Sequence, residues 1–431
     1  MANLINLYLS AKKIQTHGQS MEPFLFDGDV LFLVKKPVNR IKINDFITFK
    51  VKNLFITHRV IFKHTKDDYL ITKGDNNHVA DKKVYPKQII GVVDSVKRRG
   101  QLISIESLYL IQSTLYFQEI AKVSKLFFNE KIDFLILKGL PLHLYFENEY
   151  PKRIYADCDF LIDKRHFDEV IRILRTLGFT SVSTPLSKIH GALKDKNPEV
   201  TFYKKVNGIN VILDIHLEAV FLMTQLGNLN MLYPQKLIDE LSLELLREKK
   251  FIRVRGFDFP VLALEYLVVY LGLHLFHHNF RGYFRYELMK NIIKGQKVNF
   301  NKMLEIIIKY KLEDFVYPVF YFLKKTYSSP IDKKFLRVLE KRMKSSQYFR
   351  KIISKISIFE DEGRLVSGVN RFKNIYELSP NPQLYKIWIF LNPQVIYSVV
   401  WVLQKRVIYS LNKIFLSSSK DNNSSISREA S

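Results

Sequence analysis

Three residue types in the first hundred positions have the chemistry of a covalent hydrolase. Ser20 stands in the segment GQSMEP and His58 stands in THRV. Two acids, Asp75 and Asp81, follow in TKGDNNHVAD. A serine hydroxyl becomes a nucleophile only when a neighbouring base takes its proton, and a carboxylate that fixes the imidazole tautomer completes such a site. We therefore predict Ser20 as the nucleophile, His58 as the base and one of the two acids as its partner.

A second group of acids, in the middle of the chain, has the spacing of a metal site. Asp157 and Asp159 lie two residues apart in the apolar segment YADCDFLI, and Asp214 lies in VILDIH. Alternate residues of a strand face the same side of a sheet, so the first two carboxylates should lie side by side. Oxygen ligands of this kind suit Mg²⁺, which assists phosphoryl and nucleotidyl transfer. A lone Asp-x-Asp pair is most often an exposed strand edge, so the surrounding sequence must decide.

The other potential metal ligands favour structural roles. His274, His277 and His278 fall in one expected helix, but no acid accompanies them at the spacing of a zinc protease. We expect these three to be core or surface histidines. His216 follows the last acid of the metal group by two residues, and a structural role is also the better interpretation for it. Cys158 should point to the opposite face of its strand, where it would be buried and unreactive.

The elements that would carry the serine are short strands separated by turn residues. This pattern predicts an all-β unit over residues 1–102, closed by the basic segment KRRG. The expected strands are 31–34, 45–51, 54–62, 68–74 and 89–96.

The elements that would carry the acids alternate between strand and helix. Apolar residues at helical spacing predict a long helix over 103–128, and a mixed α/β pattern follows up to residue 224. From 225 to 416 nearly every segment has helical periodicity, so we expect an all-α region there. Residues 417–431 are rich in serine and asparagine and predict a disordered tail. The expected fold class is thus multidomain α+β: an all-β barrel, a central mixed α/β sheet and a C-terminal all-α region.

The ordered set SMEP, a Gly-Asp turn, HRV, TKGDNN with an acid six residues later, and IIG resembles the signal peptidase family. The variant is the one of the endoplasmic reticulum and of sporulating bacteria, in which histidine replaces the lysine base. The resemblance covers residues 16–96 and implies a β-barrel serine peptidase acting on a peptide or preprotein without a cofactor. It implies Ser20 as nucleophile, with its backbone N–H in the oxyanion hole, and His58 as base. Asp81 would orient the histidine, with Asp75 in support.

Two features depart from the signal peptidase pattern. That family normally has a transmembrane helix just before the serine, whereas the 19 residues before Ser20 cannot span a membrane. Gly18 stands where a second oxyanion donor sometimes lies. A related family of LexA-like autoproteases would need a lysine near position 58. These departures favour a soluble processing peptidase, or one that is tethered through a partner.

The middle of the chain resembles an uncharacterised branch of the polymerase-β-like nucleotidyltransferases. The motifs are LILKGLPL, RIYADCDFLI, a helix ending in LGF, and LDIH, over residues 123–218. The segment around LGLHLFHHNF and FRYEL extends the likeness, with Glu287 in place of an expected aspartate. The resemblance implies NTP and Mg²⁺ as cofactors, with Asp157, Asp159 and Asp214 as metal ligands. It implies that the residues facing phosphate are Lys138, Gly139 and Arg153.

Composition limits the remaining function classes. The 431 residues carry a formal net charge of +25, and 47% of them are hydrophobic, which excludes a disordered chain. The basic residues are spread along the chain, so we expect no specific nucleic acid. Two apolar stretches, 259–276 and 387–403, are interrupted by polar residues and fall short of a membrane span. We expect the first stretch to form a buried helix and the second to make a peripheral contact with an anionic membrane. The protein itself is expected to be cytoplasmic.

The sequence as a whole predicts a serine endopeptidase of signal peptidase type fused to a Mg²⁺-dependent nucleotidyltransferase. Three other hypotheses stay open. The chain could be a non-catalytic scaffold that retains both folds, or a nucleotidyltransferase whose peptidase-like unit only binds a substrate. It could also be a maturation factor that trims the leader of a genetically linked peptide.

Overall fold

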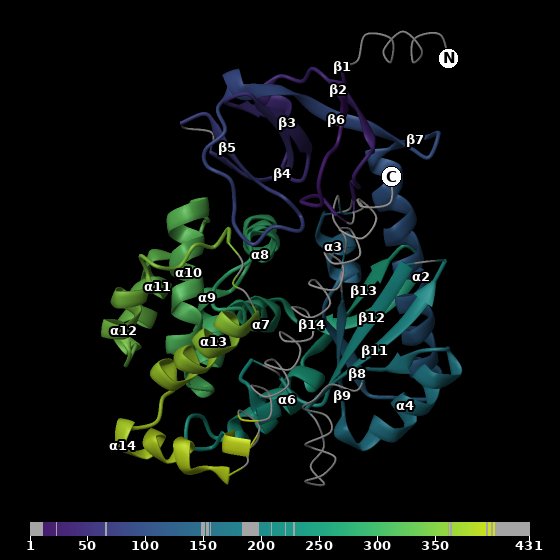
Figure 1. Cartoon of the computed structure of the whole chain (residues 1–431). Coiled ribbons are helices and arrows are strands. Elements are labelled where there is room, and N and C mark those ends of the chain that lie inside the picture. Colours follow the sequence, from purple (N-terminus) through teal and green to yellow (C-terminus); the bar gives the residue numbers. More distant parts are fainter. Residues whose placement is uncertain are drawn as a thin grey trace, which may run out of the picture.

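The computed structural model describes most of residues 12–400. The residues outside the description are 1–11, 23, 65–66, 148–150, 152–154, 156, 183–197, 208, 220, 227–228, 361, 363, 394, 398–399 and 401–431. Arg153 and the predicted tail 417–431 therefore lie outside the described residues. The described part contains two seven-stranded sheets, with helices beside the second one (Figure 1).

The first sheet is antiparallel throughout and occupies the N-terminal hundred residues. Its strand order is β1-β2-β6-β3-β4-β5, and β7 pairs with the end of β6. Apolar side chains from both faces are buried: Phe46 belongs to one core cluster, and Ile47 and Phe49 to another. All five predicted strands form, and β1 and β7 are additional. The strands are β1 (Lys12–Gln15), β2 (Val30–Val34), β3 (Phe46–Val51), β4 (Leu54–His64), β5 (Tyr69–Lys73), β6 (Ile89–Arg98) and β7 (Gln101–Ser104).

The second sheet is mixed and has the order β10-β11-β12-β9-β8-β14-β13. Strand β9 runs parallel to β12 and antiparallel to β8, so these three neighbours form the centre of the sheet. Every residue of β9 is buried, because helices cover the sheet. The strands are β8 (Phe134–Lys138), β9 (Cys158–Ile162), β10 (Thr180–Ser181), β11 (Glu199–Val206), β12 (Ile209–His216), β13 (Lys249–Val254) and β14 (Phe257–Leu262).

Helices pack around this second sheet. The long helix α2 (Ile105–Asn129) contacts both α3 (Leu140–Glu147) and α4 (Phe167–Thr176). The buried helix α7 (Leu264–His277) packs against α8, α9 and α10 and has buried side chains on all sides from residue 266 to 276. The remaining helices are α6 (Gln235–Arg247), α8 (Tyr283–Gly295), α9 (Phe300–Lys309), α10 (Glu313–Tyr327), α11 (Lys333–Arg342), α12 (Ser346–Ile352), α13 (Arg364–Leu378), α14 (Gln383–Lys386) and the 3-10 helix η5 (Ile387–Leu391).

The all-α expectation for residues 225–416 is wrong at one place. Strands β13 and β14 form a hairpin there and join the central sheet through β8. Arg255 and Gly256 connect them with φ angles of 50° and 86°, which is the two-residue turn that a hairpin requires. The apolar stretch 259–276 is accordingly strand β14 followed by helix α7, and not one buried helix. Among the described residues, every helix is too short or too polar to cross a bilayer.

The N-terminal sheet rests on the helical part of the chain through an aromatic contact. Phe62 of β4 lies with its ring centroid 5.9 Å from that of Tyr327 at the end of α10. The ring centroid of Phe359 lies 5.1 Å from that of Phe62. Strand β4 also contacts α8. The buried ring of Phe62 thus packs the N-terminal sheet against the helical part of the chain.

Replacing Phe62 by alanine should loosen this junction. Removing a buried phenylalanine ring costs about 3 kcal/mol, since a cavity remains. We expect Phe62→Ala to lower the unfolding temperature of the N-terminal sheet. We also expect it to make the chain between the N-terminal sheet and the rest of the protein more sensitive to protease. Differential scanning calorimetry and limited proteolysis measure both effects. Phe251→Ala, at an exposed phenylalanine of β13, is the matched control, and equal shifts in the two variants would contradict the assignment.

Candidate active sites

Three of the residues singled out in the N-terminal sheet form one hydrogen-bonded row. Ser20 Oγ lies 3.1 Å from Nε2 of His58, and Nδ1 of the same ring lies 2.7 Å from Oδ2 of Asp81. Thr72 Oγ1 donates to that same carboxylate oxygen at 2.6 Å. His58 is buried on β4. A proton on Nδ1 is therefore held by the carboxylate, which leaves Nε2 to accept the serine proton.

Two loops that meet at Ser20 hold it in place. The amide of Asn76 donates to the carbonyl of Ser20 at 2.9 Å, and the side-chain amide of Asn76 donates to the carbonyl of Gln19. A Cβ on Gly74 would lie 2.7 Å from the Ser20 carbonyl oxygen, so only glycine allows the loops to approach this closely. On the other side, the carboxylate of Asp27 accepts the amide of Gly18, whose φ is 92°.

Asp75 is paired with the neighbour of the histidine. Its two carboxylate oxygens accept Nε and Nη2 of Arg59 at 2.6 and 2.7 Å. Arg59 also donates to the hydroxyl of Tyr109 at 2.9 Å and lies over the rings of Phe24 and Phe46. Although burial alone would lower it, the pKa of Arg59 is raised by Tyr109 and Asp75. Asp75 thus steadies β4 and its own loop, and Asp81 is the acid at the imidazole.

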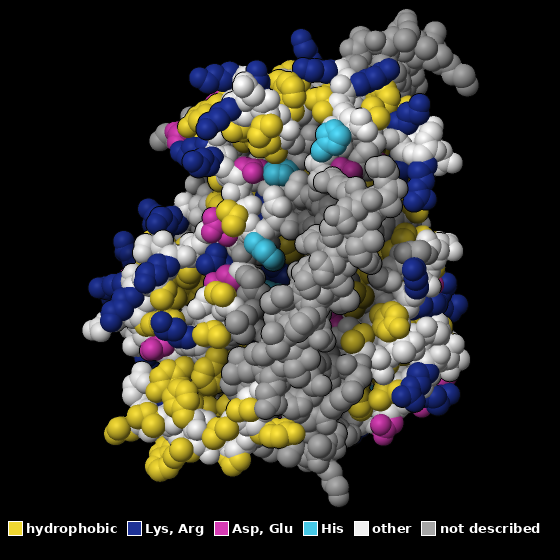
Figure 2. Space-filling view, viewed as in Figure 1, with side chains coloured by type: hydrophobic (Ala, Val, Ile, Leu, Met, Phe, Trp, Pro, Cys, Tyr) yellow, Lys and Arg dark blue, Asp and Glu magenta, His cyan; other side chains and the backbone are white. Residues whose placement is uncertain are grey.

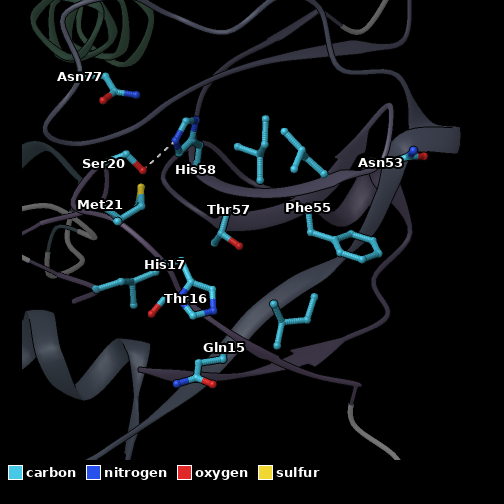
Figure 3. A pocket seen from close by; sticks show the side chains of 15 residues that line it. Gln15, Thr16, His17, Ser20, Met21, Asn53, Phe55, Thr57, His58 and Asn77 are labelled. Atoms are coloured by element: carbon cyan, nitrogen blue, oxygen red, sulfur yellow. Dashed lines mark hydrogen bonds between the residues drawn. The ribbon is translucent and has the colours of Figure 1, made fainter. Parts of the chain in front are cut away.

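A cavity of about 610 Å³ opens beside the serine and the histidine (Figure 3). Its wall is largely apolar and comes from β1, from the turn around Ser20 and from the start of β4. The apolar residues that line it are Ile14, Met21, Leu25, Leu54, Phe55 and Ile56. An extended peptide segment with apolar side chains has the chemistry to fill it.

The three central acids converge, the first two as their spacing predicts and Asp214 from a later strand. Asp159 lies on β9 and is the register partner of Asp214 on β12, while Asp157 immediately precedes β9. One ligand oxygen from each of the three lies within 4.8 Å of the others. Thr201 Oγ1 donates to Asp214 at 2.6 Å. Three carboxylates at this separation have the donor atoms and the charge to hold Mg²⁺.

Lys138 forms ion pairs with two of these acids. It ends β8, on the other side of β9, and its Nζ lies 2.6 Å from Asp159 and 3.1 Å from Asp157. Burial alone would raise the pKa of Asp159, but Lys138 and His216 lower it overall. For Asp214, burial together with Asp159 raises the pKa to about 7. Lys138 and His216 thus offset part of the charge of the three carboxylates, and a metal ion held by the acids would compete with Lys138 for them.

The residues next to Lys138 are packed tightly. Gly139 has a φ of 136°, and a Cβ there would lie 2.7 Å from Sγ of Cys158. Cys158 is fully buried, as expected, and burial raises its pKa well above the usual value. Close packing at Gly139 fixes the backbone from which Lys138 reaches the acids.

His216 is buried beside the acids and His274 is buried on α7, whereas His277 at the end of α7 and His278 directly after it are half-buried. His216 Nε2 lies 3.6 Å from Asp159; burial alone would lower its pKa, but Asp159 and Glu199 raise it to about 9. Burial lowers the pKa values of the histidines on α7 well below the usual range. His278 Nε2 lies 3.2 Å from Arg285 of α8, and His277 Nε2 lies 2.8 Å from Arg371 of α13. The rings of His277 and His278 are therefore uncharged, so the only charge in these two contacts is that of the guanidinium group.

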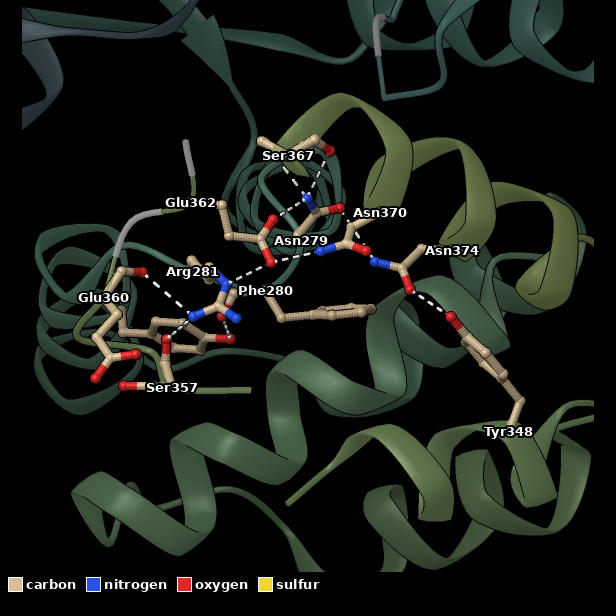
Figure 4. Close-up of polar contacts among 11 residues, drawn as sticks. Asn279, Phe280, Arg281, Tyr348, Ser357, Glu360, Glu362, Ser367, Asn370 and Asn374 are labelled. Atoms are coloured by element: carbon tan, nitrogen blue, oxygen red, sulfur yellow. Dashed lines mark hydrogen bonds and ion pairs between the residues drawn. The ribbon is translucent and has the colours of Figure 1, made fainter. Parts of the chain in front are cut away.

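A buried polar network ties α13 to the corner between α7 and α8 (Figure 4). Glu362 accepts hydrogen bonds from Asn279 and Asn370, at 2.7 and 2.8 Å, and forms an ion pair with Arg281. Asn374 of α13 donates to the side-chain oxygen of Asn279 at 3.1 Å. Asn279 has a φ of 54°, a left-handed conformation that asparagine tolerates better than most residues. This network sets the position of α13, and with it that of Arg371.

Sequence reasoning missed the residues that come from distant helices. Arg371 belongs to a helix whose apolar periodicity gives no hint of a role, and Thr201 lies on β11 as one of many strand threonines. Arg285 stands in FRYEL, a segment that extends the resemblance, but the sequence assigned no role to it. An arginine near paired histidines carries no signal until the fold brings α13 to α7. Arg153, the phosphate contact suggested by the resemblance, lies outside the described residues.

Comparison with known proteins gives two kinds of relative. Residues 94–328, more than half of the chain, match the family described as uncharacterised nucleotidyltransferase. A crystal structure of an antigenic nucleotidyltransferase-like protein from Paracoccidioides brasiliensis covers 60% of this chain and 95% of that chain, at 12% identity and a TM-score of 0.28.

The second kind of relative comprises signal peptidase complex catalytic subunits. SEC11 of Candida tropicalis is 41% identical over 73 residues, which are 16% of this chain and 43% of that protein. Human SEC11C is 42% identical over 71 residues, 15% of this chain and 37% of that protein. SEC11 of Debaryomyces hansenii is 34% identical over 110 residues, 23% of this chain and 65% of that protein. The chain thus spans less than two thirds of the length of these relatives.

The sheet with the three acids and the family match lie in the same part of the chain. The chain belongs to the uncharacterised nucleotidyltransferase family, and it carries in addition a region similar to the catalytic subunits of signal peptidase.

Proposed function

We propose that this chain is a serine endopeptidase of signal peptidase type, joined to a Mg²⁺-dependent nucleotidyltransferase. The observation that carries the first activity is the row Ser20–His58–Asp81, with both hydrogen-bond distances within reach of proton transfer. The apolar cavity at its end supports an extended peptide or preprotein segment as the substrate.

The proposed peptidase reaction follows from the groups that the two ring nitrogens of His58 face. His58 Nε2 takes the proton of Ser20 as Oγ attacks the scissile carbonyl, and Asp81 stabilises the imidazolium through Nδ1. The same proton then passes to the leaving amine, and water repeats the sequence on the acyl-enzyme. The backbone N–H of Ser20 is our candidate donor to the developing oxyanion. Thr72 holds the Asp81 carboxylate in its orientation through their hydrogen bond.

The second proposed activity rests on the convergence of Asp157, Asp159 and Asp214. These residues would hold Mg²⁺, which supplies positive charge to the phosphates of an NTP and to the attacking hydroxyl. In the structure, Lys138 occupies the position of a counter-charge between two of the acids. We propose that Lys138 turns to the triphosphate when nucleotide binds, and that Arg371 contributes a second positive charge from α13.

We also propose a division of the chain at residue 102, with the peptidase-like unit before it. We propose that the described residues of 103–224 and 225–416 act as a single catalytic unit, because β13 and β14 complete the central sheet. A purely structural scaffold, or a peptidase-like unit that only binds a substrate, is the competing hypothesis, and the variants below distinguish these from a catalytic fusion.

Removing the serine hydroxyl or the imidazole should abolish peptide cleavage. We expect Ser20→Ala and His58→Ala each to lower kcat/KM by at least about 10³-fold, and the double variant to be no worse than either one, since the two groups act as a unit. Mass spectrometry of a peptide mixture incubated with each variant measures cleavage. His78→Ala, an exposed histidine in the loop that carries Asp81, should leave cleavage unchanged. Cleavage by Ser20→Ala would rule out this nucleophile.

Substitutions at the acids and at Lys138 should change Mg²⁺ affinity in opposite directions. Asp157→Asn and Asp159→Asn remove ligand charge, so we expect each to weaken Mg²⁺ binding by about tenfold or more. Lys138→Met removes a competing ammonium group, so it should strengthen binding of Mg²⁺ alone while weakening binding of Mg²⁺–NTP. Calorimetry with each variant measures the two affinities. The same Mg²⁺ affinity in all of the proteins would exclude this metal site.

The arginine on α13 should affect nucleotide binding and not metal binding. A charge-assisted hydrogen bond to a phosphate contributes about 1.5–3 kcal/mol, so we expect Arg371→Ala to weaken NTP binding by about tenfold or more. Its affinity for Mg²⁺ alone should stay at the wild-type value. Arg253→Ala, at an exposed arginine of β13, is the control. Fluorescent nucleotide titrations that give the same affinity for the Arg371 and Arg253 variants would remove Arg371 from the site.

A further inference from the structure

A run of large apolar side chains lies on the surface near the end of the described chain. Over residues 384–400, nine of them are exposed, and Leu384 reaches 82%. Monomeric proteins rarely expose contiguous apolar surface of this kind without a binding role. The nine are Leu384, Tyr385, Ile387, Trp388, Phe390, Leu391, Ile396, Tyr397 and Val400. We refer to them as the 384–400 patch.

The polarity of this segment is inverted relative to an ordinary surface helix. Lys386, in the middle of the run, is 2% exposed, whereas its neighbours Tyr385 and Ile387 are about half exposed. Its ammonium group donates to the carbonyls of Tyr376 and Glu377, near the carboxyl end of α13. A lysine at this end of a helix satisfies carbonyls that have no partner within the helix. Lys386 thus lies on the inner side of the segment, and the apolar side chains of its neighbours Tyr385 and Ile387 lie on the outer side.

The segment is anchored to the fold. Ile389 and Val395 are buried in the main core, and the ring of Phe390 lies 5.6 Å from that of Tyr376 and 6.2 Å from that of Phe372. The patch therefore keeps its orientation because its inner side packs on α13.

Basic side chains border the patch. Figure 2 shows the apolar side chains at the lower left, with lysine and arginine side chains gathered just above them, where Figure 1 shows α11 and α12. Residues 333–355 contain nine lysines and arginines, all of them exposed, and a single glutamate. They are Lys333, Lys334, Arg337, Lys341, Arg342, Lys344, Arg350, Lys351 and Lys355. A protein partner with one matching surface would have to be apolar and strongly acidic at the same time.

We propose that the 384–400 patch and the basic surface of α11 and α12 together bind an anionic lipid bilayer. Tryptophan, tyrosine and phenylalanine are suited to the interface between lipid headgroups and acyl chains, and exposed lysines beside them are attracted to anionic headgroups. The occupant is the leaflet surface, because apolar insertion and surface charge are both satisfied there at once. This proposal does not depend on either enzymatic activity.

The two tryptophans of the chain, Trp388 and Trp401, make the proposal measurable. In the full-length variant Trp401→Phe, all tryptophan emission comes from Trp388. We expect this emission to shift to shorter wavelength with vesicles of phosphatidylcholine and phosphatidylglycerol, but much less with phosphatidylcholine alone. High salt should reverse most of the binding, since the charge attraction is screened. Sedimentation with the vesicles measures the bound fraction.

Matched variants separate the apolar from the charged contribution. Leu384→Ser with Leu391→Ser should lower vesicle binding by about tenfold or more, and Lys351→Glu with Lys355→Glu should do the same for anionic vesicles. Ile111→Ser, at an exposed isoleucine of α2 on the other side of the molecule, should have no effect. No shift of Trp388 emission with anionic vesicles would overturn the proposal. So would a shift that appears without vesicles as protein concentration rises, because that result assigns the patch to a second copy of the chain.

Discussion

The carboxylate of Asp159 is buried at the centre of a sheet, and a charge in that position must be neutralised where it lies. Lys138 and His216 reach it from the strands on either side, and Asp157 and Asp214 add further negative charge. The strand order β8-β9-β12 brings these groups together, since Lys138 comes from β8, Asp157 and Asp159 from β9 and the residue before it, and Asp214 and His216 from β12. Burial lowers the pKa of His274 on α7 well below the usual value, so this ring adds no positive charge near Lys138. The nucleotidyltransferase half of the chain is thus arranged around one compensated cluster.

The same requirement shapes the N-terminal half. Arg59 is buried among aromatic rings, and it is neutralised by Asp75 in the loop that also positions Ser20. Its bond to Tyr109 reaches α2, the helix that opens the second half of the chain. The position of Arg59, the neighbour of His58 in the chain, therefore depends on the position of α2. The two candidate sites share this mechanical connection, although they lie in separate sheets.

Much of the candidate chemistry could be predicted from the sequence, because it lies in short segments with local meaning. Ser20, His58 and Asp81 stand in turns and strands whose patterns are local, and the three central acids follow strand periodicity. The resemblance gives Asp75 a supporting role beside Asp81, and only the fold shows that its partner is Arg59. The hairpin β13–β14 was missed because two six-residue strands between long helices have too little periodicity to be distinguished. Arg371 comes from a helix more than 150 residues beyond the acids, and long-range packing of this kind leaves no local signal.

We propose that Lys138 neutralises Asp157 and Asp159 until a metal ion arrives with the nucleotide and replaces it there. A crystal structure of the full chain with Mn²⁺ and a non-hydrolysable NTP analogue tests it most directly, because manganese is located by its anomalous scattering. We expect an anomalous peak between Asp157, Asp159 and Asp214, with the ammonium group of Lys138 turned from the carboxylates to the phosphates. Lys138 still bridging Asp157 and Asp159, with nucleotide bound and no manganese beside them, would contradict it.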